Sequence, residues 1–487
     1  MKEENVNPNE LQSKSIPKSF NLTSEKIKAF GGKKTTEQIF EDLLSEIKEL
    51  DFSDYLKLPK GSNTRQKHLI VGVVKRLLEV AKDNRWNLAK VYDYIYMFNG
   101  CYWQQLEKDE LKSILGKAAI LMGVPEYDAI FVDFKDKMLK QFLSDAHFTP
   151  PKPNPESILI NLANGTFEFS PTGGKLREFD PKDFLTNQLP FEYDPNTNCP
   201  MFDQFISKVL PDEGCRMVLQ EFSGYIFSNL NLEKMLIITG NGSNGKSVFF
   251  NIICALVGKD NLLNYAVGSF NHEYNRAKLL GKLLNFSSEK GADLDPDILK
   301  TLISREPIQA REPYGKSFNM EIGTKFMMNA NELPKITEIT DAFFRRQCII
   351  HFGAKITESE KDIHLADKII KNELPGIFNW LLIGLARLQQ QQAFTFSEKI
   401  EQEVNEFKKQ SDSVALFVEE KAYIPNTNNK MLVAELYKDY KSFCLDDGYK
   451  ALGKNRFSTR LKNLGFSDTR VSGGGAAFFI EIDYSRD

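Results

Sequence analysis

The chain has 487 residues, too many for one ordinary hydrophobic core, and this length predicts two to four domains. Hydrophobic residues make up 41% and charged residues 26% of the sequence, the composition of a water-soluble globular protein. The formal net charge is only −3, so any surface that binds nucleic acid must be a local basic patch.

The cysteines and the apolar runs exclude several classes of protein. The six cysteines are scattered without a Cys-x-x-Cys pair, which disfavours a zinc knuckle or a disulfide framework and favours reduced thiols in a cytosol. The first ten residues, MKEENVNPNE, are polar and acidic, so no signal peptide is expected. No apolar run reaches the roughly 18 residues of a membrane span. We therefore expect a cytoplasmic protein that does not bind a membrane.

The composition predicts five segments in chain order. Residues 1–60 are expected to form a polar N-terminal arm, mobile or partner-binding, with one short helix. Residues 61–215 are expected to form an α+β domain that includes a hairpin turning at Asn99-Gly100. Residues 216–388 contain the glycine-rich segment described next. A linker helix at 389–410 and a small C-terminal domain at 411–487 follow.

Residues 240–247 read GNGSNGKS and match G-x-x-x-x-G-K-[ST], the pattern of a phosphate-binding loop. An apolar strand-like run, KMLIIT, precedes them, and an apolar helix-like run, SVFFNIICALVG, follows. Glycines let backbone N–H groups converge on an anion, and the next helix directs its positive end to the same point. The alternative is a plain glycine turn, but the flanking runs favour ATP binding. We predict that the nucleotide contacts Gly240, Asn241, Gly242, Ser243, Asn244, Gly245, Lys246 and Ser247, with Lys246 on the β- and γ-phosphates and Ser247 on Mg²⁺.

Three further polar positions flank the apolar runs downstream. Glu289 ends KLLNFSSE and is predicted to polarise the attacking water and to help hold Mg²⁺. Asn331 ends FMMNAN and is predicted to sense the γ-phosphate, with Asn329 as the fallback. Arg345 and Arg346 precede another apolar run, and an arginine there could enter a neighbouring subunit's nucleotide site. Each position taken alone has an ordinary alternative. Glu289 could be a surface carboxylate, Asn331 could belong to an Asx turn, and the two arginines could be a surface basic pair. Their order after the loop favours a ring-forming ATPase with parallel strands.

With these motifs in order, the sequence resembles superfamily 3 helicases, and more narrowly the phage, plasmid and poxvirus primase-helicase type. The resemblance covers roughly residues 92–484 and rests on NLANGTFEFS, VLQEFSGYIF, GNGSNGKS, LLNFSSE, IQAREPYGKSF, FMMNANELP, DAFFRRQ and ELPGIFNWLLIGL. It implies an α/β fold with an AAA+-like P-loop ATPase core, a hexameric ring, 3′→5′ travel, and ATP and Mg²⁺ as cofactors. It also implies that Glu289 is the acidic residue, Asn331 the sensor, and Arg346 the leading arginine finger, with Arg345 next.

The resemblance also places a DNA-contacting hairpin in the central channel, between the strands that carry the Glu and the Asn. Here that region holds Arg311, Tyr314 and Lys316. Lys316 is the best expected contact with single-stranded DNA, since a lysine can bind a passing phosphate without reading bases. The alternative is an ordinary solvated lysine.

Two features depart from the family pattern. The second strand ends in Ser-Ser-Glu where many members carry paired acids, so metal positioning is expected to depend on Ser247 and on waters. Residues 1–150 hold no convincing set of primase residues, so a separate primase or replication protein is an expected partner.

The C-terminal segment reads as two amphipathic helices followed by a glycine-tipped hairpin, the pattern of a winged helix. Residues 450–470 hold six Lys or Arg against one acid, and Lys454, Arg456 and Arg460 are the expected contacts with duplex DNA. A solvated helix face in a protein-contact module is the alternative.

The sequence therefore predicts a homo-oligomeric DNA helicase that replicates a phage or other mobile element in a bacterial cytoplasm. The alternative from another class is a non-enzymatic initiator or regulator that uses ATP only to assemble on DNA. A small-molecule P-loop kinase is disfavoured by the arginine pair and the C-terminal pattern.

Overall fold

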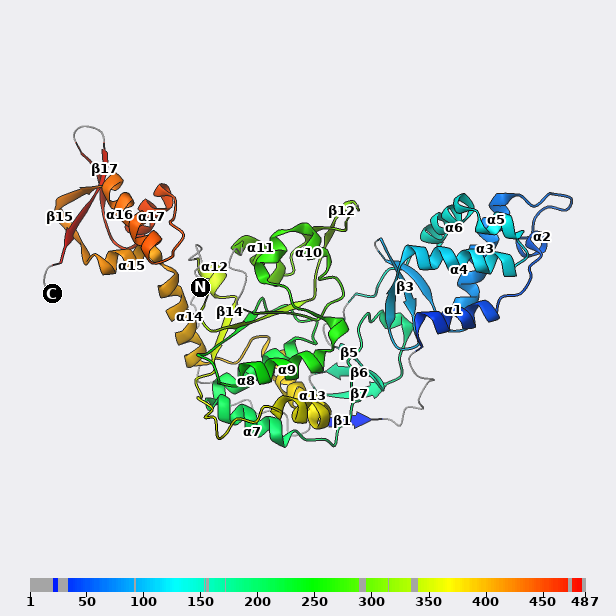
Figure 1. The fold of residues 1–487 in the computed structure, drawn as a ribbon, viewed down its shortest axis with the longest axis horizontal. Coiled ribbons are helices and arrows are strands. Elements are labelled where there is room, and N and C mark those ends of the chain that lie inside the picture. The colour runs from blue at the N-terminus through cyan, green and yellow to red at the C-terminus, as the bar shows by residue number, and fades with distance from the viewer. Residues whose placement is uncertain are drawn as a thin grey trace, which may run out of the picture.

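The computed structural model describes residues 21–24, 34–91, 93–152, 154, 157–170, 172–288, 295–313, 315–333, 340–471 and 475–483. Three lobes lie in a row along the molecule: an N-terminal helical lobe, a central α/β lobe and a small C-terminal lobe (Figure 1). All six cysteines are unpaired. Among the helices in these ranges, none combines the length and the apolar character needed to cross a bilayer.

The N-terminal lobe packs six helices beside a small antiparallel sheet. Its elements are α1 (Thr36–Ser45), α2 (Phe52–Tyr55), α3 (Gln66–Asp83), β2 (Leu88–Val91), β3 (Tyr94–Phe98), β4 (Trp103–Leu106), α4 (Lys108–Leu121), α5 (Glu126–Ile130) and α6 (Val132–Asp145). The predicted hairpin is present, because β3 and β4 flank Gly100, which adopts a φ of 92°.

The second half of the predicted arm at residues 1–60 contains the expected short helix, α1, and packs into the N-terminal lobe. Ile39 and Leu43 of α1 and Phe52 of α2 are buried in the core of the N-terminal lobe. The apolar side chains of α1 recur at helical spacing, and this face packs on α4 because burial of apolar surface outweighs the polar composition around it. Residues 1–20 and 25–33 lie outside the described residues.

The described part of the central lobe contains three sheets, the smallest of which is the two-stranded β11-β12, and the helices that pack with them. An edge sheet has the order β1-β7-β6-β5, and the main sheet has the order β14-β8-β13-β10-β9 with every pair parallel. The elements are β1 (Asn21–Ser24), β5 (Ile158–Leu162), β6 (Gly165–Ser170), β7 (Gly173–Arg177), α7 (Pro200–Val209), α8 (Glu213–Tyr225), β8 (Met235–Thr239), α9 (Lys246–Val257), β9 (Leu262–Leu263), α10 (Glu273–Ala277), β10 (Leu284–Ser288), α11 (Pro296–Ile303), β11 (Ile308–Arg311), β12 (Ser317–Met320), β13 (Lys325–Ala330), α12 (Asp341–Phe344), β14 (Gln347–His351) and α13 (Leu365–Gln391).

The main sheet is parallel and helices pack against it, as the predicted α/β fold class requires. All five residues of β8 are buried, which is why MLIIT reads as a continuous apolar run and not as an alternating one. Because the strands are parallel, the residues that follow β8, β10, β13 and β14 meet at one edge of the sheet. The glycine-rich segment is therefore brought to the same edge as Ser288 and Asn331.

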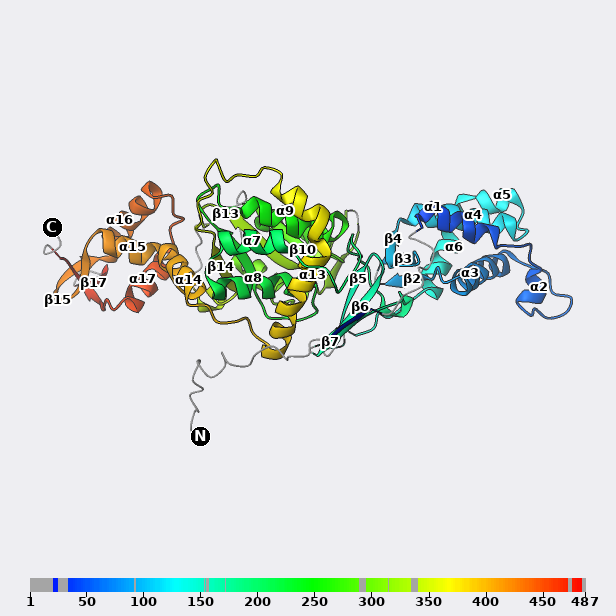
Figure 2. The same ribbon diagram turned by 90° about the horizontal axis from the view of Figure 1, so that it is seen from below.

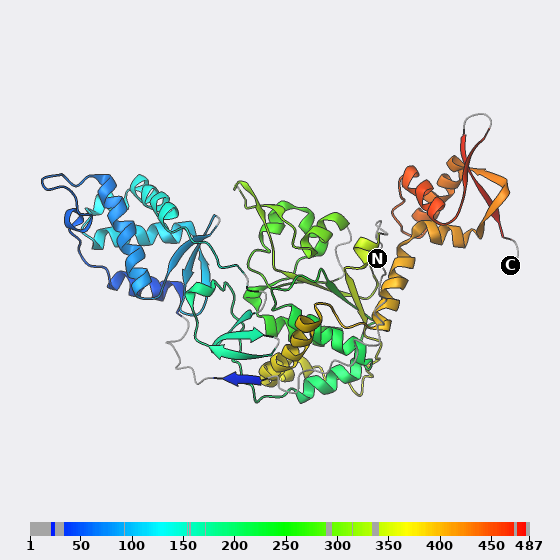
Figure 3. The same cartoon turned by 180° about the vertical axis from the view of Figure 1, so that it is seen from behind.

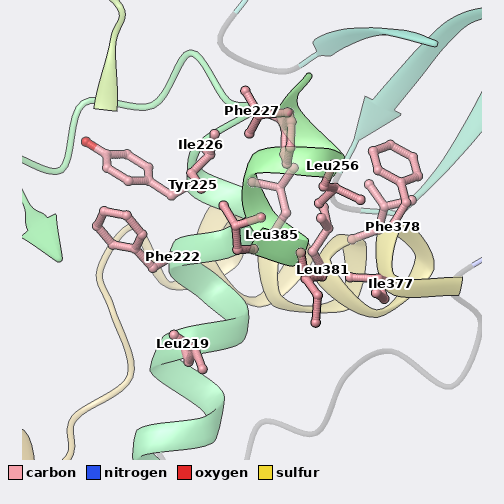
Figure 4. Close-up of a cluster of buried hydrophobic side chains, with 14 of the residues drawn as sticks. Leu219, Phe222, Tyr225, Ile226, Phe227, Leu256, Ile377, Phe378, Leu381 and Leu385 are labelled. Atoms are coloured by element: carbon pink, nitrogen blue, oxygen red, sulfur yellow. The ribbon is translucent and has the colours of Figure 1, made fainter. Parts of the chain in front are cut away.

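Helices α8, α9 and α13 pack together in one core with that sheet, and Figure 4 shows side chains of this core. Leu381 and Leu385 of α13 are fully buried against α8, and burying each contributes roughly 1.5–3 kcal/mol. The two helices approach closely at Gly224, where an added Cβ would lie 2.8 Å from the Leu381 carbonyl oxygen. Residues 158–210 share this core, so the predicted 61–215 domain is divided between the N-terminal and central lobes.

The C-terminal lobe follows helix α14 (Glu398–Ser411) and is seen from behind in Figure 3. It contains α15 (Ser413–Glu420), β15 (Tyr423–Leu432), α16 (Val433–Asp446), α17 (Lys454–Asn463), β16 (Asp468–Val471) and β17 (Gly475–Ile482), with sheet order β15-β17-β16. The predicted helices and hairpin are present. The prediction missed β15, whose polar NTNNK stretch carries no strand signature and interrupts the pairing with β17 between Pro425 and Lys430.

Candidate functional site

The glycine-rich segment forms a tight loop between β8 and α9. Gly240, Gly242 and Gly245 have φ values of 152°, 90° and 87°, which favour glycine. A Cβ added at Gly245 would lie 2.8 Å from side-chain atoms of Phe205 and Val209, so α7 packs directly on the loop. The backbone conformation thus favours glycine at all three positions, and close neighbours also require it at Gly240 and Gly245.

Lys246 begins α9 with its ammonium group folded back onto the loop. Its side chain is buried, and Nζ donates to the Gly240 carbonyl and, at 3.1 Å, to Asn244 Oδ1. Asn244 Nδ2 in turn donates to the Phe352 carbonyl at 3.0 Å. Ser247, the next residue, is exposed. A buried cation is thereby held at a helix N-terminus, where an anion would be stabilised.

A cavity of about 600 Å³ opens over this loop. Its floor includes residues 242–248, and one wall is a face of α7 formed by Met201, Gln204, Phe205, Lys208 and Val209. The opposite wall is the segment 356–365, which is tied to the loop because the Ile356 N–H donates to the Ser243 carbonyl at 3.0 Å. The cavity has the size and mixed apolar and polar lining of a small-molecule site.

An ion pair joins the two walls of the cavity. Lys208 Nζ lies 3.0 Å from Glu360 Oε1, and Glu360 also accepts from the Thr357 N–H. These interactions, led by the hydrogen bond from Lys208, lower the pKa of Glu360 to about 2. The carboxylate therefore stays ionised at neutral pH. Sequence reasoning missed both walls, because α7 carries only an ordinary amphipathic pattern and 356–365 has no motif.

The predicted sensor residues line the same cavity. Asn329 pairs in register with Ser288 of β10 and with Ile238 of β8, and Asn331 follows one residue beyond the end of β13. The Oδ1 atom of Asn329 is buried, and no described residue hydrogen-bonds to it. Glu289 lies outside the described residues, immediately after Ser288. No three His, Cys, Asp or Glu side chains within the described ranges gather as a metal-ligand set.

The two arginines are placed differently from one another. The Arg346 guanidinium donates to Ser304 Oγ at 2.8 and 3.1 Å and to the Ala342 carbonyl at 2.6 Å, and it lies 2.8 Å from Glu233 Oε2. Only 9% of its side chain is exposed, whereas 65% of the Arg345 side chain is. Arg346 is thus engaged within its own chain and Arg345 is more exposed, while the choice of a finger between them stays a prediction.

Both arginines lie at the far edge of the sheet from the glycine loop. They precede β14, which runs parallel to β8, while the loop follows β8. Five residues of strand separate the two edges by about 16 Å at roughly 3.3 Å per residue. Neither side chain can therefore reach the loop of its own chain across the sheet.

The predicted channel hairpin is formed by β11 and β12. Lys316 is exposed at its turn. Arg311 instead holds the turn together: its Nε donates to the Gly315 carbonyl at 3.1 Å, and its Nη1 lies 3.5 Å from Glu273. Tyr314 lies outside the described residues. The geometry leaves Lys316 as the available cation and gives Arg311 a structural role.

The basic residues predicted to bind duplex DNA also differ in their exposure and pairing. Lys454 and Arg456 are exposed on α17. Arg460 points inward, where its Nε donates to Asp412 Oδ2 at 2.7 Å. Asp412 is buried at the start of α15, so Arg460 joins α17 to the rest of the lobe. The charge of Arg460 is thus paired within the lobe, and its predicted contact with DNA stays a prediction.

Fold and site together define a mixed α/β protein with a parallel sheet and a glycine loop beneath a cavity.

The family "D5 N terminal like" matches residues 74–211, the family "Poxvirus D5 protein-like" matches residues 409–474, and a family of unknown function, DUF5906, matches residues 238–346. The two D5 matches support the resemblance to D5-like primase-helicases found in the sequence.

Two viral proteins are similar in sequence. "Putative helicase 121R" of Invertebrate iridescent virus 3 is 21% identical over 63% of this chain and 37% of its own length. "Putative helicase L207/L206" of Acanthamoeba polyphaga mimivirus is 24% identical over 59% of this chain and 33% of its own length. This chain thus spans about a third of either relative.

A solved structure of the apo NrS-1 C-terminal region aligns with this chain with a TM-score of 0.47. It is 13% identical in sequence and covers 82% of this chain and 98% of the solved chain.

Proposed function

We propose that this chain is an ATP-dependent DNA helicase that acts as a ring in the replication of a virus, phage or other mobile element. The observation that carries the proposal is the glycine loop of residues 240–247 with its buried Lys246, which forms the floor of a cavity at the carboxyl edge of a parallel sheet. Ligands of open α/β sheets bind at this edge. The matches to the two D5 families and the similarity to two viral putative helicases support the helicase class.

The residues present fit ATP and Mg²⁺. Mg²⁺ bound with the nucleotide would neutralise charge on the phosphates. Lys246 would exchange its loop acceptors for phosphate oxygens, and the exposed Ser247 hydroxyl is available to the metal. The buried Asn329 Oδ1 can accept a hydrogen bond and so position a water, with Asn331 beside it in the cavity. We keep Glu289 as the proposed acid that polarises this water.

Assembly into a ring is supported by the placement of Arg345. It is exposed at the sheet edge opposite its own loop, so it could complete only the site of a neighbouring copy. An arginine supplied in this way stabilises the charge of the transition state for phosphoryl transfer. We therefore propose an AAA+-like P-loop core, with Arg345 as the finger and a hexamer as the ring.

DNA contacts are proposed at two surfaces. Lys316, exposed on the β11–β12 hairpin, would bind the backbone of a single strand. Lys454 and Arg456 on α17 would bind duplex phosphates from a lobe whose helices and β-hairpin follow the order of a winged helix.

ATP turnover with and without single-stranded DNA, together with strand separation on a forked duplex, tests the function. Lys246→Ala should lower both activities by at least about a hundredfold, while Lys438→Ala, which removes an exposed lysine in the C-terminal lobe, should retain both. Turnover at the normal rate by folded Lys246→Ala protein would refute the loop assignment. ATP binding without turnover by the wild-type protein would instead support a non-enzymatic initiator.

A further inference from the structure

Helix α3 of the N-terminal lobe carries a row of exposed lysines that the proposed function does not use. Lys67, Lys75 and Lys82 are exposed, and together with Val71 they recur at spacings of four, four and seven residues. Residues at these spacings lie on one side of a helix, and Val73, on the opposite side, is fully buried in the lobe. The three lysines, which we call the basic row, therefore face solvent along about 22 Å of helix at 1.5 Å per residue.

The sequence around the basic row is strongly positive. From residue 57 to residue 90 the chain has nine Lys or Arg against two acids, a local charge of +7 in a chain whose net charge is −3. One acid, Glu79, accepts a hydrogen bond from the Tyr55 hydroxyl at 2.8 Å and lies 3.5 Å from Arg76. The other, Asp83, is exposed, but no acid among the described residues forms an ion pair with the basic row. The charge of the row is therefore available to a ligand.

Neighbouring elements add positive charge beside this row. Lys137 of α6 donates to Gln66 Oε1 at 3.2 Å, so a fourth exposed lysine lies next to the first turn of α3. Lys57, Lys60 and Arg65 are exposed between α2 and α3. Figure 2 shows α2 and α3 along one side of the lobe and α4 and α5 along the other. The α2–α3 side thus carries a run of cations from several elements.

The groups on this side of the lobe suit a phosphate backbone better than bases or an apolar surface. Sites for single strands stack bases on exposed aromatic rings. Trp86, the one Phe, Tyr or Trp in the 57–90 stretch, is half-buried, and the Tyr55 ring lies 5.0 Å from Lys75 Nζ with its hydroxyl already bonded. Val71 of the same helix side is only 36% exposed, whereas protein interfaces bury larger apolar and aromatic groups. Lysines bind phosphates as point charges and do not read bases.

We propose that the basic row binds the phosphate backbone of duplex DNA without selecting its sequence. Duplex DNA carries one negative charge per about 1.7 Å of its axis, so a row of this length meets phosphates along all of it. The site goes beyond the proposed function, in which Lys316 binds a single strand and the C-terminal lobe binds duplex. It gives the N-terminal lobe a contact with duplex that depends on neither ATP nor the glycine loop.

Duplex binding by the full-length protein tests the row. The variant carries Lys67→Gln, Lys75→Gln and Lys82→Gln, and binding is followed by the fluorescence anisotropy of labelled duplexes of about 30 base pairs. The Kd for duplex should rise at least about tenfold, and the slope of log affinity against log salt should become shallower by about two to three, since each phosphate contact contributes about 0.9. Two duplexes of unrelated sequence should lose equally. The Kd for a single strand of the same length should stay within about twofold, because Lys316 remains.

A matched control tests whether the position of the charge matters. It carries Lys48→Gln, Lys108→Gln and Lys117→Gln, which neutralise three exposed lysines of the same lobe outside α3, and it should bind duplex within about twofold of wild type. Val71→Lys instead adds a cation within the row, so it should tighten duplex binding at least about twofold and make the salt slope steeper by about one. Melting followed by circular dichroism should match wild type for each variant, because all the changed side chains are exposed.

The outcomes are distinct. Unchanged duplex affinity and salt slope in the triple variant, tested also with Lys454→Gln and Arg456→Gln so that the C-terminal lobe does not mask a loss, would overturn the proposal. An equal loss for single strand and duplex, or an equal loss in the control, would overturn it as well, because the row would then not be a duplex site. Lys246→Ala should bind duplex like wild type, so failure of the proposed ATPase and failure of this site can be told apart.

Discussion

The two adjacent arginines should respond to mutation in opposite ways. Arg345→Ala removes an exposed side chain whose described ion pair is a 3.7 Å contact with Glu233, so the free energy of unfolding should fall by only about 0–1 kcal/mol. Arg346→Ala removes hydrogen bonds to Ser304 and Ala342 together with a 2.8 Å ion pair, all at a buried position. The loss should be about 1–3 kcal/mol, because the buried Ser304 hydroxyl loses its partner while the Glu233 carboxylate is partly solvated.

The same pair should separate stability from catalysis. If Arg345 enters a neighbour's site, its removal should lower ATP turnover by on the order of 10³–10⁵ while ATP binding is retained. Thermal unfolding should leave Arg345→Ala within about 2 °C of wild type and lower the midpoint of Arg346→Ala by at least about 4 °C.

The assay combines steady-state ATP hydrolysis, with single-stranded DNA present, and melting followed by circular dichroism. Mixing Arg345→Ala with Glu289→Gln under subunit exchange should restore part of the turnover, since some interfaces then combine an intact acid with an intact arginine. Normal turnover by Arg345→Ala would refute the trans role. Unchanged melting of Arg346→Ala would refute the structural role assigned to that residue.

Three other changes test the loop and the core. Gly245→Ala should weaken ATP binding at least about tenfold, because φ at Gly245 is 87° and the new Cβ would lie 2.8 Å from side-chain atoms of α7. Gly242→Ala is also strained in φ, but its new Cβ would have no atom within 4 Å. It should therefore lose less ATP affinity in the same titration. Arg387→Ala should lower the free energy of unfolding in urea by about 3–5 kcal/mol, since it leaves the fully buried Glu221 carboxylate unpaired; a loss below about 1 kcal/mol would contradict this. Burial holds the pKa of Lys325 well below its ordinary 10.5, so between these two pKa values the unfolded chain binds more protons than the folded chain. The free energy of unfolding of the wild type should therefore rise with pH in that range. In melting curves, Lys325→Met should be more stable than wild type at pH 7 and should lack this rise.

Local sequence patterns determined the parts of this protein that depend on local physics. GNGSNGKS between two apolar runs predicted a strand, a loop and a helix, and the structure has β8, the glycine loop and α9 there. A positive φ demands glycine, and a continuous apolar run indicates a buried strand wherever it occurs. The same local rules predicted the Asn99-Gly100 hairpin and helix α17.

Only the tertiary structure decided which polar side chains are available for function. Arg345 and Arg346 are identical in chemistry and adjacent in sequence, yet Ser304 and Glu233, from distant segments, saturate one of them. Asp412 does the same to Arg460, and no local pattern marks these partners. The walls of the cavity over the loop likewise come from α7 and residues 356–365, which lie beside it only because α7 and α13 pack in the same core. Pairing and burial depend on contacts between residues far apart in the chain, and these exist only once it has folded.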